Sequence, residues 1–86
     1  MDIAAVVEAT YRNHIGLFLD VGMRTFGFDL ETAKDRLQET FIKVWQHRDT
    51  IRNPTPPGVR SFALRTYRNL SIDFLRRQKR APRRCE

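Results

Sequence analysis

The sequence has little of what disulfide cross-linking or membrane insertion requires. Cysteine occurs once, at Cys85, where neither a disulfide framework nor a metal cluster could be built around it. No apolar run approaches the ~20 residues that a transmembrane helix needs, and the first residues lack the basic and then apolar order of a secretory signal. We therefore expect a soluble cytoplasmic protein from a reducing compartment, without membrane insertion.

Candidate catalytic and metal-binding residues are also sparse. His14 and His47 fall on different predicted helices, with no second ligand at a metal-binding interval. There is no glycine-rich phosphate loop, and neither Ser61 nor Ser71 has histidine and carboxylate neighbours in sequence that would indicate a nucleophile. We expect no enzyme activity, no metal and no cofactor.

The charge of the chain is unevenly distributed. A chain of 86 residues suits one small domain whose helices share a single apolar centre. Its formal net charge is +6, but residues 1–49 carry six Lys/Arg against eight Asp/Glu, and residues 50–86 carry ten against two. The second half therefore suits a polyanion such as nucleic acid, although basic tails also occur on proteins that bind none.

Helical periodicity predicts an all-α fold, a small bundle of three main helices. The first helix should run from Ile3 to about Met23 after an N-cap at Asp2, with an apolar stripe made of Ile3, Val7, Tyr11, Ile15, Phe18 and Val21. A second helix should begin near Asp29 or Leu30 and end before the proline-rich residues 53–58. Its expected core side consists of Ala33, Leu37, Phe41, Val44, Trp45 and Arg48.

The third helix is expected from Val59 or Arg60 to Gln78. Its inward residues are predicted to be Phe62, Thr66, Leu70 and Phe74, with the apolar surface widened by Leu64, Tyr67, Ile72 and Leu75. Residues 1–80 would form the helical domain, and residues 81–86 a basic C-terminal tail that begins a linker.

Two polar faces stand out on the predicted helices. On the second helix, one face lies opposite Phe41 and Val44 and contains Asp35, Gln38, Glu39, Ile42 and Gln46. From spacing alone, this face is either ordinary solvated surface or a docking surface for another helix. On the third helix, a cationic stripe contains Arg65, Arg68, Asn69, Asp73 and Arg76 and continues through Arg77, Lys79 and Arg80.

The chemistry of this stripe suits nucleic acid. Arginine offers a bidentate fork to phosphate or to a guanine edge, and asparagine can pair with adenine, although most such cations only position the backbone. Asp73 could orient Asn69 or Arg76, or it could simply form an ion pair within the helix.

Both faces carry a pattern that resembles region 2 of bacterial sigma factors of the extracytoplasmic-function class. The pattern Ala-Glu-Asp-x-x-Gln-Glu-Thr-Phe-x-x-Val-Trp is matched at Ala33, Asp35, Gln38, Glu39, Thr40, Phe41, Val44 and Trp45. The pattern Ala-Arg-Asn-Leu-x-Ile-Asp-x-Leu-Arg-Arg is matched at Arg68, Asn69, Leu70, Ile72, Asp73, Leu75, Arg76 and Arg77. The chain departs from the usual residues at Lys34, Arg36, Ala63, Thr66 and Tyr67.

The resemblance implies a domain that binds core RNA polymerase and recognises and melts the minus-ten promoter element. Polymerase binding, to the clamp helices of the largest subunit, would involve Asp35, Gln38, Glu39 and Ile42, whereas Phe41 and Trp45 would be structural. The non-template single strand of promoter DNA would be held by Arg60, Ser61, Arg65, Tyr67, Arg68, Asn69, Asp73, Arg76 and Arg77. Phe62 could stack on a base, but its period favours the core, so Tyr67 is the expected exposed aromatic residue.

The resemblance has further implications. Residues 51–54 and 60–62 are similar to the iron-starvation subgroup, with residues 55–59 as an insertion between them. An anti-sigma factor is implied as a partner. The second domain of such factors, a helix-turn-helix reader of the minus-thirty-five element, is absent, so we expect a shortened form or a truncated reading frame. Two other functions stay open: a helical protein-interaction module, and a helix-turn-helix type DNA-binding regulator.

Overall fold

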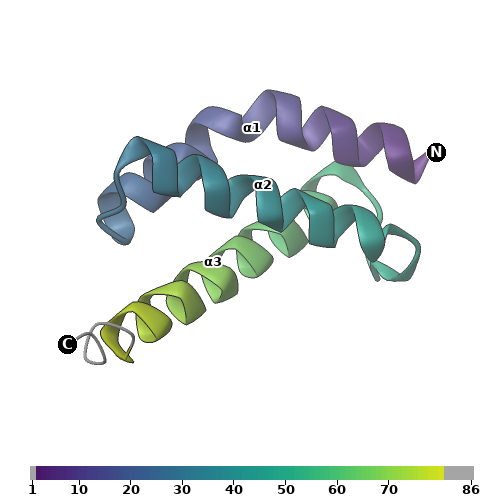
Figure 1. Cartoon of the computed structure of the whole chain (residues 1–86). Helices are drawn as coiled ribbons and strands as arrows, with labels where there is room; N and C mark the ends of the chain where they lie inside the picture. The colour runs from purple at the N-terminus through teal and green to yellow at the C-terminus, as the bar shows by residue number, and fades with distance from the viewer. Residues whose placement is uncertain (1, 81–86) are drawn as a thin grey trace.

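The computed structural model describes residues 2–80, and all of the secondary structure in this part of the chain is helical (Figure 1). The elements are α1 (Ile3–Thr25), α2 (Leu30–Gln46), the short 3-10 helix η1 (Arg48–Thr50) and α3 (Pro56–Arg80). The three main helices all contact one another, and α3 diverges from α1 and α2 toward its C-terminal end (Figure 1). The predicted all-α bundle of three main helices is confirmed. The tail predicted at residues 81–86 lies outside the described residues.

Acidic N-caps begin the first two helices, as the sequence predicts. The Asp2 carboxylate accepts a hydrogen bond from the Ala4 N–H at 3.2 Å, and the Asp29 carboxylate accepts one from the Thr32 N–H at 2.9 Å. The chain turns between α1 and α2 at Gly27, whose φ of 70° lies in the left-handed region that glycine adopts without strain. These caps and this turn fix where α2 starts and how it returns along α1.

The start of α3 differs from the prediction. The third helix was expected to begin after the prolines, at Val59 or Arg60. It begins at Pro56, three residues before Val59. The Val59 N–H donates to the Thr55 carbonyl at 2.8 Å, so Thr55 occupies the capping position. Prolines at the first helical positions lose no hydrogen bond, because those N–H groups have no partner within a helix.

The core is aromatic at its centre. Phe18 of α1 is fully buried and makes edge-on ring contacts with Phe41 of α2 and Tyr67 of α3, with centroids 5.5 Å apart in both pairs. Tyr11 adds a further edge-on contact to Phe41 at 5.2 Å. Aliphatic and small residues complete the core around these rings: Val6, Val7, Leu37, Val44, Ile51, Val59 and Ala63. The Phe18 ring of α1 therefore packs against both α2 and α3 and links the three helices in one core.

The buried side of α3 is rotated by one position from the predicted one. The fully buried residues are Val59, Ala63, Tyr67 and Ser71, whereas the predicted inward residues, Phe62, Thr66, Leu70 and Phe74, are only half-buried. One position corresponds to a rotation of about 100° in an α-helix. The buried side thus combines the small residues Ala63 and Ser71 with the large ring of Tyr67, while the rings of Phe62 and Phe74 are only half-buried.

The predicted core sides of α1 and α2 are right in part. In α1, Val7 and Phe18 are buried as expected, but Tyr11 and Ile15 remain more than a third exposed. Thr10 is buried instead, and its hydroxyl donates to the Val6 carbonyl at 2.8 Å. In α2 the buried residues are Ala33, Leu37, Thr40 and Val44. Two α2 predictions are wrong, because Trp45 is 44% exposed and Arg48 lies beyond the end of the helix.

Candidate functional site

The outer side of α2 carries the predicted polymerase-binding residues, which we call the acidic face: Asp35, Gln38, Glu39 and Ile42. Asp35, Gln38 and Ile42 are exposed, and Glu39 is half-buried. Asp35, Glu39 and Ile42 each follow a buried α2 residue by two positions, which is about 200° around an α-helix. The fold therefore directs them away from the core.

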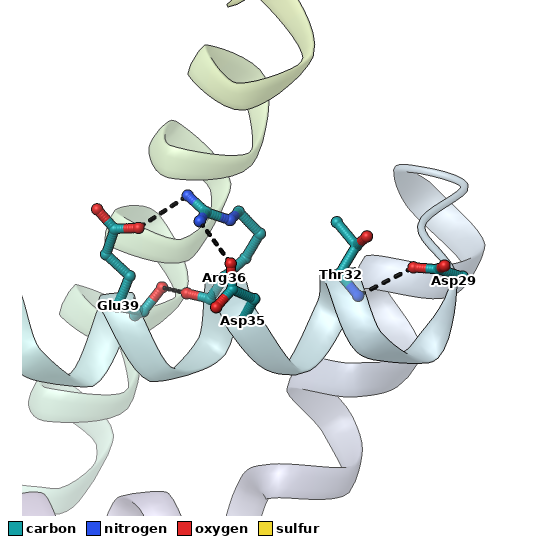
Figure 2. A network of polar contacts seen from close by, with 6 residues as sticks. Asp29, Thr32, Asp35, Arg36 and Glu39 are labelled. Carbon is teal, nitrogen blue, oxygen red and sulfur yellow. Dashed lines mark hydrogen bonds and ion pairs between the residues drawn. The ribbon is translucent and has the colours of Figure 1, made fainter. Parts of the chain in front are cut away.

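Arg36 organises the carboxylates of the acidic face (Figure 2). One terminal nitrogen lies 3.0 Å from the Asp35 carboxylate, and the other lies 2.9 Å from that of Glu39. The guanidinium also lies over the ring of Phe74 on α3, 4.8 Å from its centroid. Sequence reasoning treated Arg36 only as a departure from a pattern. Its spacing to Asp35 and Glu39 was the signal that could have identified this role.

An apolar trough borders the acidic face. Two hollows of about 320 and 420 Å³ lie between α1 and α2 and share Tyr11 and Gln38 as lining residues. We call them together the α1–α2 trough, and their apolar lining is Tyr11, Ile15, Leu19, Leu37, Phe41, Ile42 and Trp45. The trough explains why several large apolar side chains stay exposed on a small domain.

Trp45 lies in this trough and not in the core, so its predicted structural role is wrong. The Arg48 guanidinium lies 4.1 Å from the centroid of the indole, and its Nη1 donates to the Trp45 carbonyl at 2.7 Å. The cation covers one side of the ring and restricts its motion. The indole is therefore held on the surface, available for contact with another molecule.

The outer side of α3 carries the predicted DNA-binding residues. Ser61, Arg65 and Asn69 each follow a buried residue by two positions, and all three are exposed. Together with the other exposed residues of this side they form what we call the basic face: Arg60, Ser61, Arg65, Arg68, Asn69, Arg76 and Arg77. Arg80 belongs to α3, but its side chain lies outside the described part of the chain.

Asp73 is half-buried beside the basic face and pairs with Arg77, at 2.9 Å. Of the interpretations that the sequence left open, an ion pair within the helix is therefore the one observed, with Arg77 in place of Arg76. Because both partners are about half exposed or more, this pair contributes little to stability. It does lower the net positive charge at the C-terminal end of the basic face.

Tyr67 is not part of the basic face, so the expectation of an exposed aromatic residue there is wrong. The residue is fully buried against Phe18, and it cannot reach a nucleic acid strand without unfolding the core. Burial raises the pKa of the Tyr67 phenol, while the positive charge of Arg36 acts in the opposite direction. Phe62 packs against the core, as its period predicts.

Other kinds of site are not found in the described residues. Within residues 2–80, no three His, Cys, Asp or Glu side chains come together in a way that could hold a metal ion. No helix in that range is long and apolar enough to span a membrane.

Comparison with known proteins identifies the family. Residues 11–81 match the family model described as Sigma-70 region 2. The chain belongs to the sigma-70 region 2 family. The matched range of this sigma region 2 domain contains the acidic face, the trough and the basic face in full.

The relatives of this sigma region 2 domain are named as ECF sigma factors, the class that the sequence pattern resembles. The chain is 33% identical over 70 residues to the ECF RNA polymerase sigma factor SigL of Mycobacterium tuberculosis, in strains H37Rv, CDC 1551 / Oshkosh and ATCC 35801 / Erdman. The matched part is 81% of this chain and 38% of each relative, so the chain spans well under half the length of these proteins. No solved structure gives a significant match. The resemblance to region 2 of extracytoplasmic-function sigma factors is confirmed, and the iron-starvation subgroup stays a prediction.

Proposed function

We propose that this sigma region 2 domain binds core RNA polymerase through α2 and promoter DNA through α3 during transcription initiation. The observation that carries the proposal is the placement of two chemically different faces on two helices that pack in one domain. The acidic face and the basic face each lie on the side of their helix that is remote from the core. Membership of the sigma-70 region 2 family supports the assignment.

The acidic face and the α1–α2 trough suit a helical protein partner. An amphipathic helix with an apolar stripe and basic flanks would place the stripe against Tyr11, Ile42 and Trp45, and its cations against Asp35 and Glu39. Such charge pairs chiefly fix orientation and partner choice, while the apolar contacts supply most of the affinity. We propose the clamp helices of the polymerase's largest subunit as this partner. An anti-sigma factor that covers the same trough would block polymerase binding.

The basic face suits the non-template strand of an opened minus-ten element. Arg65 and Arg68 supply cations for phosphates, and Asn69 between them supplies an amide that can pair with a base edge. Extruding a base costs a few kcal/mol of stacking, which a groove that holds the strand can offset. No covalent bond changes, so we propose a binding function without enzyme activity, in the cytoplasm where polymerase and promoter are found.

The two other functions considered from the sequence are less well supported. A helix-turn-helix regulator would need a recognition helix that binds duplex DNA without polymerase, and a protein-interaction module would give the cations of α3 no specific role. The family match covers residues 11–81 and favours neither alternative.

Binding of labelled DNA tests the proposal. Fluorescence anisotropy would compare a panel of short single strands with the matching duplexes, at several salt concentrations, with and without core RNA polymerase. We expect salt-dependent binding that prefers certain single strands and tightens with polymerase. Tight duplex binding that ignores polymerase would contradict the proposal and favour a helix-turn-helix regulator.

A further inference from the structure

Arg36 is the residue at which the acidic face meets α3. Its side chain is 15% exposed, whereas those of its partners Asp35 and Glu39 are 67% and 46% exposed. One terminal nitrogen faces each carboxylate, and the Phe74 ring of α3 lies against the guanidinium. Figure 2 shows the guanidinium between the two carboxylates, on the side of α2 that faces α3. The cation is thus fixed from two helices, and it in turn restrains two exposed carboxylates.

The stability of the fold does not account for an arginine at this position. The Arg36 Nε is buried and has no hydrogen-bond partner, which is unfavourable for a buried donor. Its ion pairs go to partly exposed carboxylates, and such pairs contribute little. An apolar side chain of similar length could pack on Phe74 without either disadvantage.

The arrangement of the Asp35 and Glu39 carboxylates accounts better for an arginine at position 36. Free aspartate and glutamate side chains must be ordered when a partner binds, and this ordering opposes association. In this domain Arg36 orders both before any partner arrives. We infer that Arg36 is a positioning residue for the polymerase contact: it holds the Asp35 and Glu39 carboxylates in the geometry that receives the partner's basic groups. This inference rests on the proposed function of the acidic face.

The Arg36→Met variant separates this role from simple electrostatics. Methionine keeps the packing on Phe74 but leaves the acidic face more negative. Attraction alone would then speed association with a basic partner. Loss of positioning would instead speed dissociation, because the carboxylates are no longer held in their binding geometry. Arg36→Lys keeps the charge but loses the planar fork that faces both carboxylates, and it should fall between wild type and Arg36→Met.

Both the association rate and the dissociation rate can be measured by passing the sigma domain over core RNA polymerase that is immobilised on a sensor surface. We expect Arg36→Met to dissociate about fivefold faster, with an association rate equal to or above that of wild type. We expect its melting temperature to match or exceed that of wild type, and its binding to single-stranded DNA to stay close to that of wild type, because Arg36 lies on α2 and outside the basic face. Arg24→Met is the matched control, because Arg24 is an exposed arginine that pairs with Asp20 on α1 at 2.8 Å, away from the acidic face.

The outcomes distinguish this inference from the proposed function. If wild type binds polymerase and Arg36→Met dissociates no faster, the positioning role is overturned alone. If Arg36→Met loses stability, strand binding and polymerase binding together, Arg36 is structural and the inference is again overturned. If wild type does not bind core polymerase, the proposed function fails, and the inference fails with it.

Discussion

The Tyr67 hydroxyl of α3 lies so close to Gly22 of α1 that a β-carbon on residue 22 would collide with it. The first helix was expected to end near Met23, but it continues to Thr25, so Gly22 lies well inside α1 and is buried there. The reason for a glycine at this position is therefore space for the Tyr67 ring, and not a turn. The contact fixes how closely α1 and α3 approach.

Gly22→Ala should destabilise the fold by about 1–3 kcal/mol, the usual range for overpacking a well-packed core. The Cβ atom would meet the Tyr67 hydroxyl first, and then the Ala33 Cβ at 3.1 Å. Denaturant unfolding measures the change. Tyr67→Phe removes a buried hydroxyl that has no hydrogen-bond partner, so alone it should change stability by less than about 1 kcal/mol.

The double variant Gly22→Ala with Tyr67→Phe tests the contact itself. Because the hydroxyl is the nearest obstacle, removing it should recover part of the stability that Gly22→Ala loses. If the two effects simply add, the collision is not the cause of the destabilisation.

Stability at low pH should depend on the Asp29 cap of α2. Hydrogen bonds from the Thr32 side chain and then from its backbone N–H lower the pKa of Asp29 below its ordinary value of 3.8. A carboxylate with a depressed folded pKa stabilises the fold above the unfolded pKa, and this contribution is lost as the pH falls through the folded pKa. Asp29→Asn caps without titrating, so the melting temperatures of wild type and Asp29→Asn should converge or cross below pH ~4. A constant difference between the two down to pH ~2 would contradict the cap's titration.

Trp45→Ala should weaken polymerase binding by at least about tenfold, as is common for an exposed aromatic residue at an interface. Its melting temperature should change little, since the side chain is 44% exposed and lies outside the core. Leu17→Ala is the control, because Leu17 is 43% exposed on α1 and lines neither hollow of the trough. Equal effects of the two variants on polymerase affinity would exclude a specific role for Trp45.

Arg65→Ala should reduce the salt dependence of strand binding. Each lost phosphate contact lowers the slope of log K against log salt by about 0.7 for a single strand. Asn69→Ala should leave this slope unchanged and should alter base preference instead. Arg24→Ala removes an equal charge from α1 and should change neither property, provided that binding is local to α3.

The sequence predicted where the helices lie along the chain better than it predicted which side of each helix is buried. The acidic caps at Asp2 and Asp29 and the periodic apolar residues located α1 and α2 to within a few residues. The start of α3 was missed because prolines such as Pro56 and Pro57 are common both in turns and in the first turn of a helix. Local sequence does not distinguish the two.

The buried side of α3 could not be predicted from apolar periodicity. Apolar residues occur all around this helix, and its buried side combines the small residues Ala63 and Ser71 with the large Tyr67. Size complementarity between helices is a tertiary property. The same limit explains Tyr67, whose burial depends on space left by Gly22 on another helix.

The sequence predicted which polar residues of the candidate site are exposed, but it did not predict the trough beside them. The exposure of Asp35, Gln38, Arg65 and Asn69 follows from their spacing, and the structure agrees. Their roles in binding stay predictions. The trough around Trp45 was missed because it requires α1 and α2 to lie side by side, which no pattern within one helix reveals.

If the acidic face and the basic face bind different molecules, a pair of double variants will separate the two activities. Core polymerase capture and single-strand binding would be measured for Asp35→Ala with Glu39→Ala, and for Arg65→Ala with Asn69→Ala, with circular dichroism to verify folding. We predict that the first pair loses polymerase and keeps the strand, and that the second pair loses the strand and keeps polymerase. If both pairs, still folded, lose both activities, the two-face account is wrong.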